Sequence, residues 1–144
     1  MATPIDAGDA RFLQEFEDGV LEKSAFKHRD HVRLAWVLLS VCDADEASER
    51  VGRGIRAFAA RHGASGLFHV TVTEAWMRVV AVAMAADAAT PTTRAAANFD
   101  EWIAGHPDLL DASLLARYFS DDVLKSPAAK QAWIEPDRMP LPPV

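Results

Sequence analysis

Apolar residues recur along most of the chain at the three- and four-residue spacing of an amphipathic α-helix. This spacing predicts helices over residues 7–18, 29–42, 45–62, about 71–87 and 93–104, and shorter ones over 109–118, 121–124 and 127–133. Gly19 and Gly63 follow the first and third of these helices and are typical helix-ending residues. We therefore expect an all-α, single-domain helical bundle of four main helices, with short C-terminal helices and an extended Pro-rich tail.

One segment of the pattern is ambiguous between helix and strand. The β-branched run from Val70 to Thr73 alternates as a strand would, but no partner strand is visible elsewhere in the chain. Thr71-x-x-Glu74 also has the form of a helix capping box. We therefore expect this segment to open a helix. That helix is apolar on nearly all sides, which predicts a central, buried position.

The two ends of the chain differ from its middle. Residues 1–6 and 135–144 lack helical periodicity, and the last ten residues are rich in proline, which favours an extended backbone. We expect one helical domain over residues 1–144 whose two ends are extended or poorly ordered.

Composition and charge narrow the function classes. The net charge of -6 argues against a nucleic-acid partner, because binding to a phosphate backbone needs a basic face. The single cysteine, Cys42, excludes an intramolecular disulfide and fits a reducing compartment. We find no leader pattern and no apolar stretch long enough to cross a bilayer, so we expect a cytoplasmic protein without a membrane partner. The oligomeric state stays open.

Three of the five histidines lie at or just before the start of two predicted helices. His28 and His31 are three residues apart, a spacing that places side chains on the same helix face. Both extend the inward-facing stripe of the second helix, and His69 extends an inward-facing stripe of the fourth. If these two helices pack with their N-termini at the same end, the three imidazoles converge in one pocket.

Histidines at helix starts favour metal binding. The partial positive charge of a helix N-terminus disfavours imidazolium, and neutral imidazole is the form that binds metals. Three histidines with an open coordination position suit one first-row transition metal, namely Zn, Cu, Fe or Ni. Thr71 and Thr73 are candidates for hydrogen bonding a bound ligand. The predicted catalytic residues and metal ligands are His28, His31 and His69, with Glu17 as a further metal ligand.

Three function classes stay open on these residues. The first is a metal-dependent enzyme acting on a small organic molecule, in which the metal serves as Lewis acid or activates water or oxygen. The second is a metal-free, histidine-dependent isomerase, lyase or cyclase with one histidine as general base. The third is a non-catalytic small-molecule binding or interaction module with structural histidines. His62 and His106 are expected to be structural.

Three segments together carry a resemblance. They are F-K-H-R-D-H-V-R-L-A-W at residues 26–36, F-H-V-T-V-T-E-A-W at 68–76 and P-D-R-M-P-L-P at 136–142. This order resembles a group of small helical bacterial proteins with F-x-H-x-x-H-x-x-x-A-W and aromatic-H-x-T-x-T segments. The resemblance runs from about residue 16 to 141, and Phe68 stands where a tyrosine is expected. It implies that the three histidines, Thr71 and Thr73 share one site, and it names no reaction.

Overall fold

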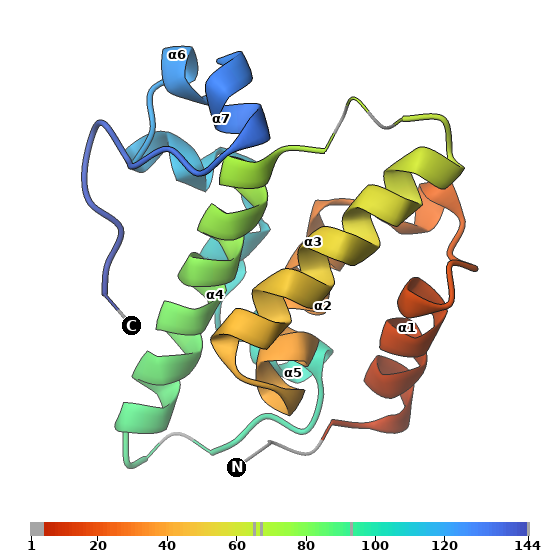
Figure 1. Cartoon of the computed structure of the whole chain (residues 1–144). Helices are drawn as coiled ribbons and strands as arrows, with labels where there is room; N and C mark the ends of the chain where they lie inside the picture. The colour runs from red at the N-terminus through yellow and green to blue at the C-terminus, as the bar shows by residue number, and fades with distance from the viewer. Residues whose placement is uncertain (1–4, 65, 67, 93, 144) are drawn as a thin grey trace.

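Four main helices build the molecule. The structure, a computed structural model, describes residues 5–64, 66, 68–92 and 94–143, and these contain helices and loops but no strand. The main helices are α1 (Ala7–Glu17), α2 (His28–Val41), α3 (Ala44–Arg61) and α4 (Val70–Ala89), shown in Figure 1. The all-α, single-domain prediction is confirmed. The β-branched run at residues 70–73 opens α4, as predicted.

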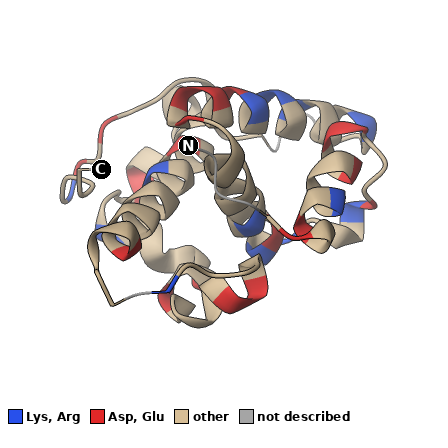
Figure 2. Ribbon diagram, turned by 90° about the horizontal axis from the view of Figure 1, so that it is seen from below, with Lys and Arg blue, Asp and Glu red and all other residues tan. Residues whose placement is uncertain are grey.

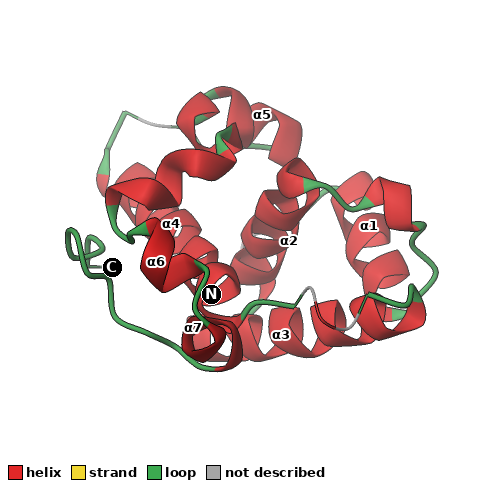
Figure 3. Ribbon diagram, turned by 90° about the horizontal axis from the view of Figure 1, so that it is seen from above, coloured by secondary structure: helices red, strands yellow, loops and turns green. Residues whose placement is uncertain are grey.

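Shorter helices connect and cover this frame. They are η1 (Lys23–Ala25), α5 (Phe99–Ala104), η3 (Pro107–Leu110), η4 (Ala112–Arg117), α6 (Asp121–Leu124) and α7 (Pro127–Gln131), where η denotes a 3-10 helix. Figure 3 shows α5 beside α2, and α7 packs against α4.

Two of the predicted helices have different bounds in the structure. The helix expected over residues 93–104 begins at Phe99, because the Asn98 side chain accepts from the Glu101 N–H at 2.8 Å and caps it there. The helix expected over 109–118 is two 3-10 helices. They break at Asp111, whose carboxylate accepts from the Ser113 N–H at 2.9 Å. In both cases a polar side chain competes with the continuing backbone ladder.

The core forms around α2 rather than around α4. Val32, Leu34, Val37 and Leu38 of α2 are fully buried, and α2 packs against α1, α3, α4 and α5. The prediction of α4 as the central helix is wrong. Its first half is buried, but its second half carries several exposed alanines whose methyl groups add little apolar area to the core.

Close approaches hold α1 on this core. A β-carbon at Gly54 would lie 2.2 Å from the Phe16 ring, so only glycine lets α3 meet α1 this closely. Asp9 is buried, and its carboxylate accepts from Arg33 of α2 and from the Phe99 N–H of α5, both at 2.9 Å. This buried carboxylate joins three helices.

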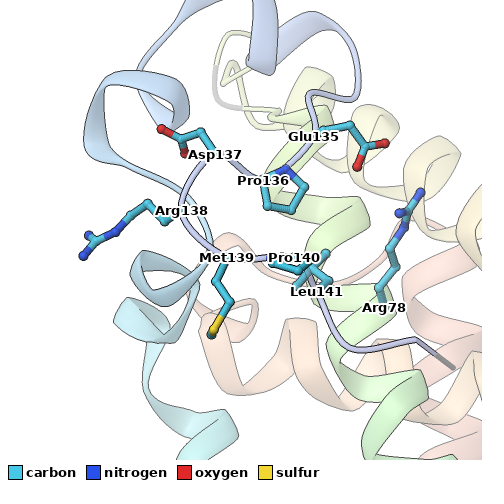
Figure 4. A pocket seen from close by; sticks show the side chains of 8 residues that line it. All are labelled: Arg78, Glu135, Pro136, Asp137, Arg138, Met139, Pro140 and Leu141. Carbon is cyan, nitrogen blue, oxygen red and sulfur yellow. The ribbon is translucent and has the colours of Figure 1, made fainter.

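The C-terminal tail is extended, as predicted, and tied to the domain. The Arg138 N–H donates to the Tyr118 carbonyl at 2.9 Å, and the Ser120 N–H donates to the Asp137 carboxylate at 2.7 Å. Figure 4 shows the shallow hollow of about 340 Å³ that the tail forms with Arg78 of α4.

The surface carries both signs of charge. Lys and Arg residues are interspersed with Asp and Glu on several helices (Figure 2). Within the described ranges, no helix is both long enough and apolar enough to cross a membrane.

Candidate functional site

Helices α2 and α4 begin at the same end of the molecule (Figure 1). His28 and His31 lie in the first turn of α2, and His69 immediately precedes α4. All three side chains line one cavity of about 490 Å³, which we call the histidine pocket. Most of its wall is apolar. Its apolar lining includes Phe26, Ile55, Phe68, Trp76, Met77 and Leu115.

Both ring nitrogens of His69 form hydrogen bonds with the backbone. Its Nδ1 accepts from the Val72 N–H at 3.1 Å, so His69 is the N-cap of α4 in place of the expected Thr71. Its Nε2 donates to the Leu124 carbonyl at 2.7 Å. Because a carbonyl only accepts and the Val72 N–H only donates, the ring is the Nε2–H tautomer and both nitrogens are used.

His28 is held through one nitrogen only. Its Nε2 donates to the Leu109 carbonyl of η3 at 2.9 Å, and its ring meets the Trp76 ring edge-on with centroids 4.5 Å apart. The contact with Leu109 fixes the ring orientation. It leaves Nδ1 as the nitrogen available to a ligand.

His31 is the histidine of the pocket without a hydrogen bond to any described residue. Its ring lies against Phe26, with centroids 4.2 Å apart, and neither nitrogen is sealed from solvent. Burial, reinforced by repulsion from His28 and opposed by Asp30, lowers the pKa of His31 from 6.5 to about 4. At neutral pH the ring is therefore an uncharged imidazole facing an apolar cavity.

Of the three remaining predicted site residues, one lines the pocket and two bind groups elsewhere in the protein. Thr73 lines the pocket. Thr71 is fully buried, and its hydroxyl donates to the Ala132 carbonyl at 2.8 Å and accepts from the Ile134 N–H at 3.1 Å, so it anchors the C-terminal segment instead. Glu17 does not reach the pocket, because both its carboxylate oxygens bind Arg50, at 2.6 and 2.9 Å.

These contacts decide how well the donor set fits a metal ion. Both nitrogens of His69 are used, and the Glu17 carboxylate is paired elsewhere. Of the predicted ligands, only His28 and His31 keep a ring nitrogen without a described hydrogen-bond partner, and both residues line the pocket. In the part of the chain that the structure describes, no group of three or more His, Cys, Asp and Glu side chains is placed to hold one ion. The three-histidine metal site expected from the sequence does not fit this arrangement, since such sites need at least three protein ligands.

One polar cluster escaped the sequence analysis. The Asp87 carboxylate accepts from Trp102 Nε1 at 2.9 Å and from His106 Nε2 at 2.8 Å. These partners lie 15 and 19 residues away in the chain, so no local motif joins them. A signal was present nonetheless, because Asp87 lies on an inward stripe of α4 that is otherwise largely apolar and a carboxylate there needs partners. His62, by contrast, ends α3 outside the histidine pocket, and its Nε2 lies 3.2 Å from both the Leu21 carbonyl oxygen and the Arg61 guanidinium.

Comparison with known proteins adds no further constraint on the site. The chain matches no protein-family model, no curated protein and no solved structure. The chemistry of the histidine pocket is therefore argued from its own residues.

Proposed function

We propose that the protein binds a small organic molecule in the histidine pocket and that His31 exchanges a proton with it without a metal ion. The observation that carries this proposal is the position of His31, an imidazole on the wall of an apolar cavity with no described hydrogen-bond partner, where burial lowers its pKa to about 4. A partly buried polar group of this kind gains most from a ligand that supplies the missing hydrogen bond.

The cavity supports one class of ligand. Its volume of about 490 Å³ suits a small molecule, and its wall favours an apolar body. Uncharged His31 accepts a hydrogen bond through its unprotonated nitrogen, so the ligand is expected to present an O–H, N–H or acidic C–H group there.

The low pKa of His31 bears on the class of reaction. A base whose conjugate acid has a pKa of about 4 is unprotonated at neutral pH and returns a captured proton readily. This suits an isomerase, lyase or cyclase, in which the proton goes back to the substrate or its product. His28, oriented by Leu109, is the second group able to take part through Nδ1. A metal-dependent reaction has less support, because His69 and Glu17 are engaged elsewhere.

The proposal also concerns the compartment of the protein and the kind of partner that it binds. We propose a cytoplasmic protein whose partner is a small molecule rather than a nucleic acid. The net charge of -6 and the interspersed charges support a partner that is not a nucleic acid.

Phenol and benzene test the role of His31, because they differ only in the hydroxyl that would donate to it. We expect phenol to bind the wild type between about twofold and tenfold more tightly than benzene, which is the range for one hydrogen bond. His31→Phe keeps a ring against Phe26 and should abolish the difference. His62→Phe, outside the pocket, should leave it unchanged. Equal affinities in the wild type, or an unchanged ratio in His31→Phe, would overturn the proposal.

A further inference from the structure

A second cavity lies between the C-terminal halves of α2 and α4, at the other end of these helices from the histidine pocket. It has a volume of about 470 Å³, and no described residue lines both it and the histidine pocket. We call it the Asp87 cavity. Its wall includes Trp36 and Ser40 of α2, Met84 and Asp87 of α4, and Trp102 and His106 from α5 and the turn after it.

The donors closest to Asp87 are already used within the protein, whereas the indole N–H of Trp36, another lining residue, has no described partner. Trp102 Nε1–H and His106 Nε2–H both donate to Asp87 Oδ2, at 2.9 and 2.8 Å. The Ser40 hydroxyl donates to the Trp36 carbonyl at 2.7 Å. Ser40 is 3% exposed and lines the cavity, so a ligand can approach the remaining lone pairs of its hydroxyl oxygen only from the cavity.

Apart from the Trp36 indole N–H, the groups left over on this wall are acceptors. Among described residues, nothing donates to Asp87 Oδ1, to the Ser40 oxygen or to the second nitrogen of His106. That nitrogen, Nδ1, accepts whenever the ring is uncharged, because the proton of Nε2 is given to Asp87. A ligand that satisfies these groups must therefore bring donors.

Charge at the cavity points the same way. Of the lining residues described, the one Lys or Arg is Arg94, which lies on the exposed rim and pairs with Glu101 at 3.1 Å. Asp87 has no such cation within hydrogen-bonding distance, since its two partners are an indole and an imidazole. The inner wall therefore favours a positive charge beside Asp87.

We infer that the Asp87 cavity binds a small primary amine in its protonated form. An ammonium group brings one positive charge and N–H donors, which match the Asp87 carboxylate and its free oxygen Oδ1. The body of the amine would lie against the apolar part of the wall, formed by Met84, Ala96 and the edge of Trp36. The site stands independently of the function proposed for the histidine pocket.

Benzylamine and benzyl alcohol test this inference in the wild-type protein, because the two probes share their ring and differ in the ammonium group. The Trp102 indole N–H, which donates to Asp87, is the NMR reporter, and its signal is identified by its loss in Trp102→Phe. We expect benzylamine to shift this signal and to bind at least about tenfold more tightly than benzyl alcohol, as for a charge-assisted hydrogen bond. Equal affinities, or shifts confined to Trp76 of the histidine pocket, would overturn the inference.

Two matched variants locate the interaction. Asp87→Asn removes the charge but keeps an oxygen that accepts from Trp102, and it should weaken benzylamine binding at least about tenfold. Asp100→Asn removes the same charge from an exposed site on α5, where Asp100 pairs with Arg29, and should change the affinity less than about twofold. Unchanged binding in a folded Asp87→Asn protein, or an equal loss in Asp100→Asn, contradicts the inference. If Asp87→Asn fails to fold, the wild-type comparison of the two probes decides alone.

Discussion

Histidines at the starts of α2 and α4 line the same pocket, but they occupy different helix positions and have different hydrogen-bond partners. In α2, the Asp30 carboxylate accepts from the Lys27 N–H at 2.9 Å, so an acidic side chain completes the helix start. In α4, His69 itself is the N-cap residue, and its ring accepts from the Val72 N–H. His28 and His31 are the first and fourth residues of α2, after its N-cap Lys27, so neither ring caps that helix.

This difference explains why similar histidines at helix starts are not equivalent. A ring nitrogen that accepts from a backbone N–H is unavailable to a ligand unless the helix end is broken. Whether a histidine occupies the N-cap position thus decides whether its ring is used by the helix end. His69 is therefore part of the start of α4, whereas His31 lines the pocket without a described hydrogen-bond partner.

The largest expected effect comes from His69→Ala. The variant loses the cap of α4, worth about 1 kcal/mol, and leaves the Leu124 carbonyl without its donor, which costs about 1–3 kcal/mol more. We expect the free energy of unfolding, measured with denaturant, to fall by about 2–4 kcal/mol. His69→Asn should recover the capping part, because its side-chain oxygen accepts from the Val72 N–H. A loss below about 0.5 kcal/mol in the alanine variant would show that His69 is not a structural residue.

The pH dependence of stability separates His31 from the other histidines. Its pKa is lowered from 6.5 to about 4 on folding, so between these values the unfolded chain binds a proton that the folded protein does not. Stability falls as the pH drops through this window, by roughly 3 kcal/mol in total, and the effect is absent above pH 6.5. Denaturant titrations at several pH values should show a shallower decline in His31→Phe than in the wild type. Parallel curves for the two proteins would contradict the burial of His31.

The two threonines at the start of α4 also differ in whether they stabilise the fold or line the pocket. Thr71→Val removes a buried hydroxyl that satisfies two backbone groups and should destabilise the protein by about 1–3 kcal/mol. Thr73→Val, on the pocket wall, should change stability by less than about 0.5 kcal/mol. Thermal melts of the two variants check the prediction, and a larger loss for Thr73→Val would reverse the assignment.

The smallest expected effect concerns metal ions. Because His69 is committed to the backbone, Zn²⁺, Cu²⁺, Fe²⁺ or Ni²⁺ should leave the melting temperature of tag-free protein unchanged relative to chelator. A rise with one of these ions that disappears in both His31→Phe and His69→Asn would instead support the three-histidine metal site.

The sequence predicted what depends on local spacing. Apolar periodicity placed all four main helices to within about two residues, and the spacing of His28 and His31 placed them on one face of α2. It could not show that the carbonyls of Leu109 and Leu124 would bind His28 and His69, because those contacts span 81 and 55 residues. The same holds for Glu17, whose partner Arg50 lies 33 residues away. Tertiary packing decides which distant group binds each of these side chains, and the periodicity of the sequence does not describe that packing.

Long-range ¹H–¹⁵N correlation spectra of the five imidazoles, recorded against pH with and without phenol, test the central claim most directly. The account predicts that His31 stays uncharged until the pH approaches about 4 and that its signals shift when phenol binds at pH 7. It predicts that His69 is the Nε2–H tautomer and does not respond to phenol. Titration of His31 near its ordinary pKa of 6.5, or a phenol response at His69 in place of His31, would contradict the account.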